Sequence, residues 1–444
     1  MLKLRKSTLQ KAFIPMIISF IGFSSNYALS IALANVLNKD QFGVISYTLM
    51  INSLLATFIA LGTDSNSKNF LTLYIKEKAL RRLNFYISWN IEVFSKPVII
   101  SLILFSILFF IIDPFTLYFD HQLTEFEKIT TTILFTAPFY AATSILSNYL
   151  LCDFKVKLFT YFFYMQTNAL MAMLILVAIY TDLLQASLSL ILTLFILVNI
   201  FNLISCLIAI KIKSPIIYEC FKHRYHKKKL ATKMHTWNKG ARAQLITNFL
   251  KKAMLKIDFI IMIYFSQSHA ELGIYGIAMN TAIILTAIPI GVFQHIVPSI
   301  SSIVKSSKDK KMVQALWNQS LLINTLVVFL GAYGLHLYAK EIILCFYGPG
   351  FIDAAQLIQI MCITYTFTSI CGCKSALFAF TGNTTYANFT YYMRIVLCII
   401  LAYAFKDYGI TGVAYASLIS EFTRTVISII LIRKTLNFKS LGVI

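Results

Sequence analysis

The feature that most constrains this chain is a series of apolar stretches, each about 20 residues long and nearly free of charge. A helix of that length crosses the roughly 30 Å hydrocarbon core of a bilayer. Twelve stretches follow one another, near residues 12–36, 43–62, 93–112, 129–151, 158–180, 185–210, 243–266, 273–298, 314–339, 351–380, 385–405 and 409–432. The sequence therefore predicts an all-α integral membrane protein with twelve transmembrane helices. The stretch 351–380 is long enough to be tilted, kinked or partly outside the bilayer.

The composition excludes other classes of protein. Of the 444 residues, 58% are hydrophobic and 13% are charged. Soluble domains are about 45–50% apolar and about 25% charged, so a water-soluble enzyme and a disordered or fibrous chain are both excluded. The basic N-terminus could begin a signal peptide, but its apolar run is longer than such signals carry. We interpret it as the first span.

The basic residues are distributed unevenly between the two sides of the predicted spans. With the N-terminus inside, 29 of the 39 lysines and arginines lie on the inner side and four on the outer side. Because cytoplasmic loops are enriched in these residues, both termini are expected in the cytoplasm. This distribution accounts for the net charge of +21 without a nucleic-acid partner. The largest outer loop, 113–128, is too short for a folded domain.

The longest hydrophilic segment divides the spans into six and six. It covers residues 211–242 and contains ten basic residues. We expect an N-terminal half at 1–210, a solvated basic cytoplasmic linker at 211–242 and a C-terminal half at 243–444. Two such halves can be parallel repeats that enclose a central cavity. A short echo supports this, because Phe42-Gly43 and Leu272-Gly273 each open the second span of a half.

The seventh span carries the most informative charges. Its polar residues fall within an arc of about 160° on a helical wheel. They are Gln244, Asn248, Lys251, Lys252, Lys256 and Asp258. Ionisable groups at membrane depth are costly and mark functional sites. We therefore expect this face to line a water-filled cavity.

Other charges in or near the spans allow two interpretations each. Lys374 could bind substrate or extend to the cytoplasmic surface, and Arg394 could bind a ligand or cap an interior contact. Glu421 and Arg424 are three residues apart, so they could form a local pair or take part in gating. Asp64 and Lys68 could be polar groups of a loop or a gate at the inner mouth of the cavity.

Motifs for chemistry are absent from the sequence. There is no Walker A motif, no G-x-S-x-G and no H-E-x-x-H, and the eight cysteines show no metal-binding spacing. We expect no enzyme activity and no cofactor. Within the spans, six positive charges outnumber two negative ones, Asp258 and Glu421. A cationic cavity without catalytic groups indicates transport of an anionic substrate.

Several stretches resemble polysaccharide exporters and O-antigen flippases of the multidrug, oligosaccharidyl-lipid and polysaccharide exporter superfamily. They are LGIYGIAMNTAIILTAIPIGVFQHIVPSIS at 272–301, Lys256-Ile257-Asp258, residues 35–43, EIILCFYGPGFIDAAQLIQIM at 341–361 and YGITGVAYASLISEFTR at 408–424. The matches occur in the family's order along nearly the whole chain.

The resemblance implies a flippase of the bacterial cytoplasmic (inner) membrane that works by alternating access. Its substrate would be an undecaprenyl-diphosphate-linked oligosaccharide, such as an O-antigen repeat unit of lipopolysaccharide. Its partners would be membrane lipid, a coupling cation, and a polysaccharide polymerase with a chain-length regulator. Lys251, Lys252 and Lys256 would attract the diphosphate, assisted by Arg394 and Lys374. Asp258 would change its protonation or pairing between the inward and outward states.

The sequence also departs from the family pattern and leaves alternatives open. Lys68 stands where members often have an arginine, and a lysine cannot bind phosphate bidentately. Twelve spans rather than fourteen argue against lipid II as the substrate. A cation-coupled drug exporter would prefer an acidic cavity, and a polysaccharide polymerase would need a long outer loop. A structural membrane protein would have no need of charges on an interior face.

Overall fold

A computed structural model describes residues 2–110, 125–180, 188–222, 231–266, 268–287, 289, 310–370, 377–378 and 383–436. The regular structure in these ranges is entirely helical. The chain forms two compact units by its contacts: unit 1 comprises Met1–Gly43 and Ala253–Ile444, and unit 2 comprises Val44–Lys252. By its contacts the first helix therefore groups with the C-terminal part of the chain.

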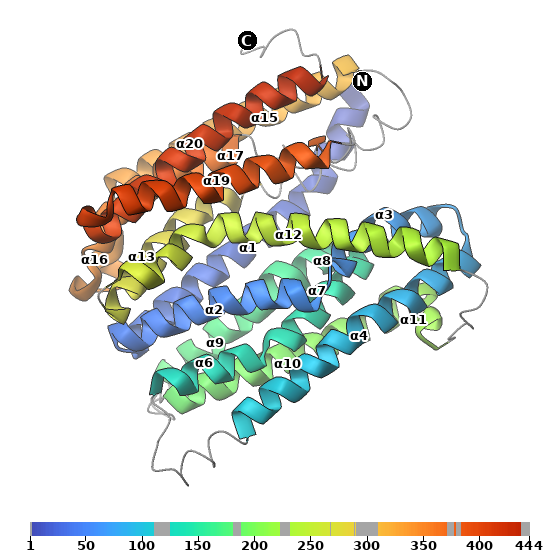
Figure 1. Ribbon diagram of the computed structural model, residues 1–444, viewed down its shortest axis with the longest axis horizontal. Coiled ribbons are helices and arrows are strands. Elements are labelled where there is room, and N and C mark those ends of the chain that lie inside the picture. The colour runs from blue at the N-terminus through green and yellow to red at the C-terminus, as the bar shows by residue number, and fades with distance from the viewer. Residues whose placement is uncertain are drawn as a thin grey trace. The chain divides into compact units, whose positions relative to one another are not determined.

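Unit 2 contains the helices that follow α1 in the first half of the chain. They are most of α2 (Lys39–Ile59), then α3 (Thr63–Lys76), α4 (Leu80–Phe110), α6 (Glu125–Phe135), α7 (Ala137–Cys152), α8 (Val156–Thr160), the π-helical turn η1 (Tyr161–Met165), α9 (Gln166–Tyr180), α10 (Leu188–Lys213), α11 (Pro215–Lys222) and the first part of α12 (Ala231–Phe265). Within this unit α3 and α10 both pack on α7. The long helix α12 is continuous through the boundary at Lys252 (Figure 1).

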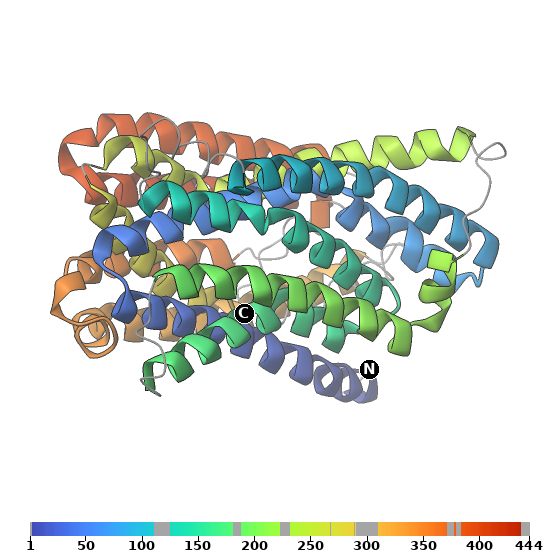
Figure 2. The same cartoon turned by 90° about the horizontal axis from the view of Figure 1, so that it is seen from below.

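Unit 1 combines the first helix with the last ones. Its elements are α1 (Leu2–Val36), the start of α2, the end of α12, α13 (His269–Ala282), the short 3₁₀ turn η3 (Ile283–Thr286), α15 (Lys310–Leu337), α16 (Ala339–Phe346), η4 (Pro349–Phe351), α17 (Ala354–Ile370), α19 (Thr384–Ala404), η5 (Lys406–Tyr408) and α20 (Gly409–Leu436). The helices α19 and α20, drawn in red, lie side by side and form the most extensive helix pair (Figures 1 and 2). Helix α17 packs on α20 and on α15.

The described helices confirm a multi-pass membrane protein. Eight are long and apolar enough to cross a bilayer, and the pair Asn324–Leu337 and Ala339–Phe346, bent by 69°, would be a ninth. The eight match the first six and last two predicted spans. The seventh, α12, is helical but too charged to meet the same criterion, so twelve spans stay a prediction.

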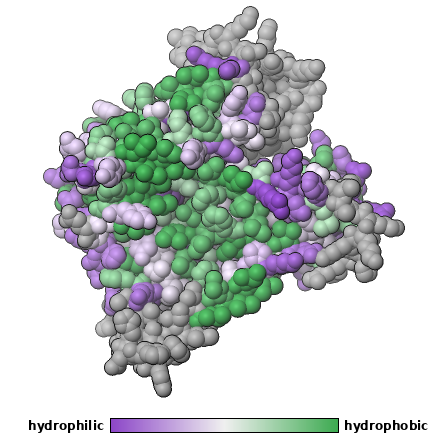
Figure 3. All heavy atoms as spheres, viewed as in Figure 1, coloured by the Kyte–Doolittle hydropathy of each residue, from purple (hydrophilic) through white to green (hydrophobic). Residues whose placement is uncertain are grey.

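The surface of these helices has the polarity expected in lipid. Helix α4 exposes Ile99, Ile100, Ile103 and Leu104, each by more than half of its surface. Figure 3 shows hydrophobic side chains across much of the visible face. Apolar side chains on the outside and polar ones inside are the arrangement that a bilayer favours.

The described parts of the basic segment 211–242 are helical. Its beginning belongs to α10 and α11, and its end forms the first turns of α12, while residues 223–230 lie outside the described ranges. Trp237 is fully buried in unit 2, with its ring centroid 5.2 Å from that of Tyr86 and 5.5 Å from that of Trp89. The charges alone suggested solvation, but the buried aromatic and apolar residues between them anchor the segment in the core.

The two positions of the sequence echo meet each other in unit 1. A Cβ added at Gly43 would lie 1.9 Å from the His269 carbonyl oxygen, and one at Gly273 would lie 2.9 Å from the Lys39 carbonyl oxygen. The starts of α2 and α13 therefore cross with their backbones in contact. Only glycine allows so close an approach at Gly43.

Replacing Gly43 by alanine is expected to destabilise the protein by about 1–3 kcal/mol, because the methyl group overlaps backbone atoms that cannot move aside. The apparent Tm of the purified protein measures this. Gly334→Ala is the matched control, since nothing lies within 4 Å of a Cβ at that helical position. It should leave the Tm unchanged or raise it. Equal effects of the two substitutions would contradict the close crossing.

Candidate functional site: a buried charge network and a lysine face

Helix α20 presents its polar residues to the interior of unit 1. Ser417, Glu421, Arg424 and Ser428 recur at helical spacing and are at most 2% exposed. The opposite face exposes large apolar side chains such as Phe422 and Ile430. Spacings of three and four residues place these polar side chains on one face of the helix. The apolar face opposite is suited to contact with lipid.

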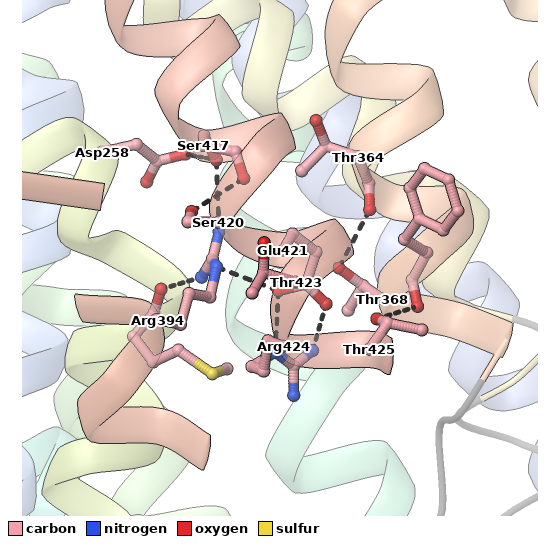
Figure 4. Close-up of polar contacts among 12 residues, drawn as sticks. Asp258, Thr364, Thr368, Arg394, Ser417, Ser420, Glu421, Thr423, Arg424 and Thr425 are labelled. Atoms are coloured by element: carbon pink, nitrogen blue, oxygen red, sulfur yellow. Dashed lines mark hydrogen bonds and ion pairs between the residues drawn. The ribbon is translucent and has the colours of Figure 1, made fainter. Parts of the chain in front are cut away.

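The carboxylate of Glu421 lies between two guanidinium groups. Its Oε2 is 2.9 Å from Nε of Arg394 in an ion pair and accepts a hydrogen bond of 2.8 Å from Nε of Arg424. Its Oε1 accepts a second bond from Nη2 of Arg424. Figure 4 shows Arg394 approaching from α19 while Arg424 lies on α20 with Glu421. The interpretation of Glu421 and Arg424 as a local pair is confirmed.

The guanidinium of Arg394 has further partners on other helices. Its Nη1 donates to the backbone oxygen of Met254 on α12, and its Nη2 donates to Oγ of Ser417 at 3.2 Å. Its Nε makes no hydrogen bond, so its contact with Oε2 of Glu421 is an ion pair only. Arg394 itself is only 4% exposed. The interpretation of Arg394 as the cap of an interior contact fits this geometry.

Asp258 completes the network from α12. Its Oδ2 accepts a hydrogen bond from Oγ of Ser417 and another from the hydroxyl of Tyr275 on α13, both 3.2 Å long. Its Oδ1 accepts from the backbone amide of Phe259 at 3.1 Å. Ser417 thus connects the Asp258 carboxylate to the Arg394 guanidinium, and four helices, α12, α13, α19 and α20, share one polar cluster.

The charges of this cluster cancel. Arg394 and Arg424 contribute two positive charges, and Asp258 and Glu421 contribute two negative ones; each of the four side chains is at most 6% exposed. A buried charge is tolerated when it is paired and hydrogen-bonded. Two of the six positive charges expected within the spans, Arg394 and Arg424, are therefore neutralised within unit 1.

The three lysines of α12 have different surroundings. Lys251 is exposed, and Lys256 is partly buried. Lys252, also partly buried, donates from Nζ to the Ser53 carbonyl oxygen at 3.1 Å, and its ammonium lies 6.0 Å from the ring centroid of Tyr140. By its contacts Lys252 belongs to unit 2, whereas Lys256 and Asp258 belong to unit 1.

Asp64 and Lys68 lie on α3 rather than in a loop. The Asn248 amide of α12 donates to Oδ1 of Asp64 at 3.4 Å and to Oγ of Ser65 at 2.8 Å. The ammonium of Lys68 lies 5.9 Å from the ring centroid of Phe159. Desolvation lowers the pKa of Lys68, while the nearby Asp64 acts in the opposite direction. Asp64 and Ser65 therefore attach α3 to the polar face of α12, whereas Lys68 lies against Phe159 of α8.

Two members of the network were not recognised in the sequence as site residues, Ser417 and Tyr275. Ser417 could have been found, because it precedes Glu421 by four residues and so lies on the same face. Tyr275 gives no such signal, since its contact with Asp258 joins two helices. Lys374 lies outside the described residues. Within the described ranges no group of three His, Cys, Asp or Glu side chains is placed to hold a metal ion.

Solved structures of two kinds of transporter share this fold. An inward-facing multidrug resistance MATE family transporter of the MOP superfamily superposes with a TM-score of 0.69 at 12% identity, covering 96% of this chain and 98% of the other. The lipid II flippase MurJ in an inward closed conformation gives 0.67 at 15% identity, covering 96% and 89%. No curated protein sequence matches. The chain thus has the fold of these two solved structures.

The family follows from the sequence match. A model of the family described as "Polysaccharide biosynthesis protein" matches residues 32–356, which is most of the chain. The chain belongs to this family. The resemblance to polysaccharide exporters is therefore confirmed.

Replacing Glu421 by glutamine is expected to destabilise the protein by about 3–5 kcal/mol, because it removes the negative charge that two buried guanidiniums share. The apparent Tm of the purified protein reports the loss. Glu92→Gln is the control, since Glu92 pairs with Lys96 at 4.0 Å on an exposed helix surface. That pair should contribute at most about 1 kcal/mol. If the Glu421→Gln variant is as stable as Glu92→Gln, the Glu421 carboxylate does not stabilise the protein as expected.

Proposed function

We propose that this protein moves a lipid-linked oligosaccharide, carried on undecaprenyl diphosphate, from the inner to the outer leaflet of a bacterial cytoplasmic membrane. Family membership makes a polysaccharide precursor the natural cargo. The single observation that carries the proposal to an anionic lipid head group is the lysine set of α12, Lys251, Lys252 and Lys256. An O-antigen repeat unit is the member of this class that we favour.

The lysines suit a diphosphate for an electrostatic reason. An ammonium is a compact donor of three hydrogen bonds and binds phosphate as a point charge, without the fixed geometry of arginine. The membrane potential then favours export, because moving one negative charge outward from a negative interior gains about 2.3 kcal/mol per 100 mV. The apolar polyprenyl chain can remain in lipid throughout.

The other charged residues receive different proposed roles. We place Arg394, Glu421 and Arg424 in the scaffold of unit 1, and we keep Lys374 as an assisting cation. Asp258 is the proposed coupling residue, since hydroxyl groups hold its carboxylate and no guanidinium contacts it directly. Asp64 and Lys68 are proposed to gate the inner mouth through the α3–α12 contact. A polymerase and a chain-length regulator would use the exported product.

A cation-coupled exporter of small molecules is the second candidate. The likeness to a multidrug transporter favours it. Such an exporter of cationic drugs would use acidic groups to bind its cargo. The described part of α12 offers Asp258 alone, and that carboxylate is buried among hydrogen-bond donors. Drug susceptibility of cells that overproduce the protein separates the two candidates, because a lipid-linked oligosaccharide flippase should not confer resistance.

The orientation of the chain is a second part of the proposal. Both termini should lie in the cytoplasm, because 29 of the 39 basic residues fall on that side of the predicted spans. The orientation can be measured with reporter enzymes that are active on only one side of the membrane. One reporter is fused after Arg433 and the other within 113–128. The first fusion should be active only as a cytoplasmic reporter and the second only as an external one. The reverse pattern would refute the orientation.

Replacing Lys251, Lys252 and Lys256 by glutamine is expected to lower export about tenfold for each lysine, because each removes a charge-assisted contact worth about 1.5–3 kcal/mol. Cells lacking the native protein and carrying each variant are assayed for surface polysaccharide and for lipid-linked oligosaccharide on the inner leaflet. Surface polymer should fall while the lipid-linked precursor accumulates.

Lys340→Gln and Lys406→Gln serve as controls, since both lysines are exposed outside the lysine face. They should export at the level of the unmodified protein. Each variant is compared at equal amounts in the membrane, so that a loss of protein is not mistaken for a loss of export. Normal polymer in all three single variants and in the triple variant would refute the role of the lysines.

A further inference from the structure

The oxygen atoms around Arg394 have the composition of a cation site. They are the Met254 backbone oxygen from α12, Oε2 of Glu421 and Oγ of Ser417 from α20. Oδ2 of Asp258 does not contact Arg394 in this set, but it accepts a hydrogen bond from the Ser417 hydroxyl. A carbonyl, a carboxylate and a hydroxyl are the groups that a positively charged ligand requires.

The charge balance requires a cation at this position. Without the Arg394 guanidinium, Asp258 and Glu421 would face Arg424 alone, leaving one negative charge among side chains that are at most 6% exposed. Lys256 lies two residues before Asp258 and interacts with it electrostatically, but the ion pairs among the described residues of this cluster join Glu421 to the two arginines. The other titratable groups that act on Arg394 are Tyr365 of α17 and Cys398 of α19. Neither carries a positive charge.

We propose that unit 1 contains a built-in cation site that the Arg394 side chain fills, and that shortening this side chain opens the site to a free guanidinium ion. The native chain supplies its own cation from α19, so unit 1 holds together without binding one from solution. A planar ion is the expected ligand, because the three oxygen atoms are arranged around a planar, three-nitrogen group. This proposal concerns the stability of unit 1 and is independent of the substrate.

The test is rescue of Arg394→Ala by guanidinium. The purified variant is heated in 0–50 mM guanidinium chloride, with equal concentrations of sodium chloride and urea in parallel. Guanidinium should raise the apparent Tm of this variant by several degrees and reach a plateau, as binding to the folded state requires. Sodium chloride and urea should not. An equal response to sodium, or a guanidinium response no larger than that of the unmodified protein, would overturn the proposal.

Arg394→Met is the matched control, because it removes the same charge but fills the space with an unbranched side chain. Its Tm should be low and should not respond to guanidinium. If it responds as Arg394→Ala does, the ion binds elsewhere and the site is refuted.

A double variant covers the case in which Arg394→Ala does not fold. Arg394→Ala combined with Glu421→Gln leaves Arg424 and Asp258, whose charges cancel. The double variant should be recovered in larger amounts than Arg394→Ala, should unfold at a higher temperature, and should ignore guanidinium. If the double variant is recovered no better than the single one, an unpaired carboxylate is not the cause of the loss, and the proposal fails.

Discussion

The carboxylate of Glu421, held between Arg394 and Arg424, is the interaction on which the rest of unit 1 depends. A single unpaired charge at this depth would cost several kcal/mol, so the three side chains stabilise one another by pairing. The same requirement determines the face of α20 that points inward and brings α19 beside it. It also draws in α12 and α13, because Arg394 reaches Met254 and the Ser417 hydroxyl reaches Asp258. A small charge cluster thereby orients four helices.

Helix α12 has a different character along its length. Its beginning is anchored in unit 2 by the buried ring of Trp237 and by Gly240, where an added Cβ would lie 2.6 Å from the Asn66 side chain. Its end belongs to unit 1 and carries Asp258. The lysines lie between these two anchored parts.

The fold alone does not identify the substrate that the protein moves, so the substrate class has to be argued from the charged residues. MATE transporters and MurJ share this architecture, yet their names describe different cargoes, multiple drugs and lipid II. Function is decided by the site and not by the fold. In this chain the acidic groups at membrane depth are bound to arginines and hydroxyls inside unit 1. The proposal of a lipid diphosphate therefore rests on the lysines of α12, together with membership of a family described as "Polysaccharide biosynthesis protein".

The sequence by itself determined the class of protein, because the length and polarity of apolar segments follow directly from the thickness of the bilayer. It also identified Asp258, Arg394, Glu421 and Arg424 as unusual, because charges within spans are costly wherever they pack. It offered the pairing of Glu421 with Arg424, which depends only on helical spacing, as one of two interpretations. Only the tertiary structure decided that Arg394 joins that pair, that Tyr275 and Ser417 hold Asp258, and that the first helix groups with the last ones. These contacts join helices far apart in the chain, and local spacing carries no information about which helices become neighbours.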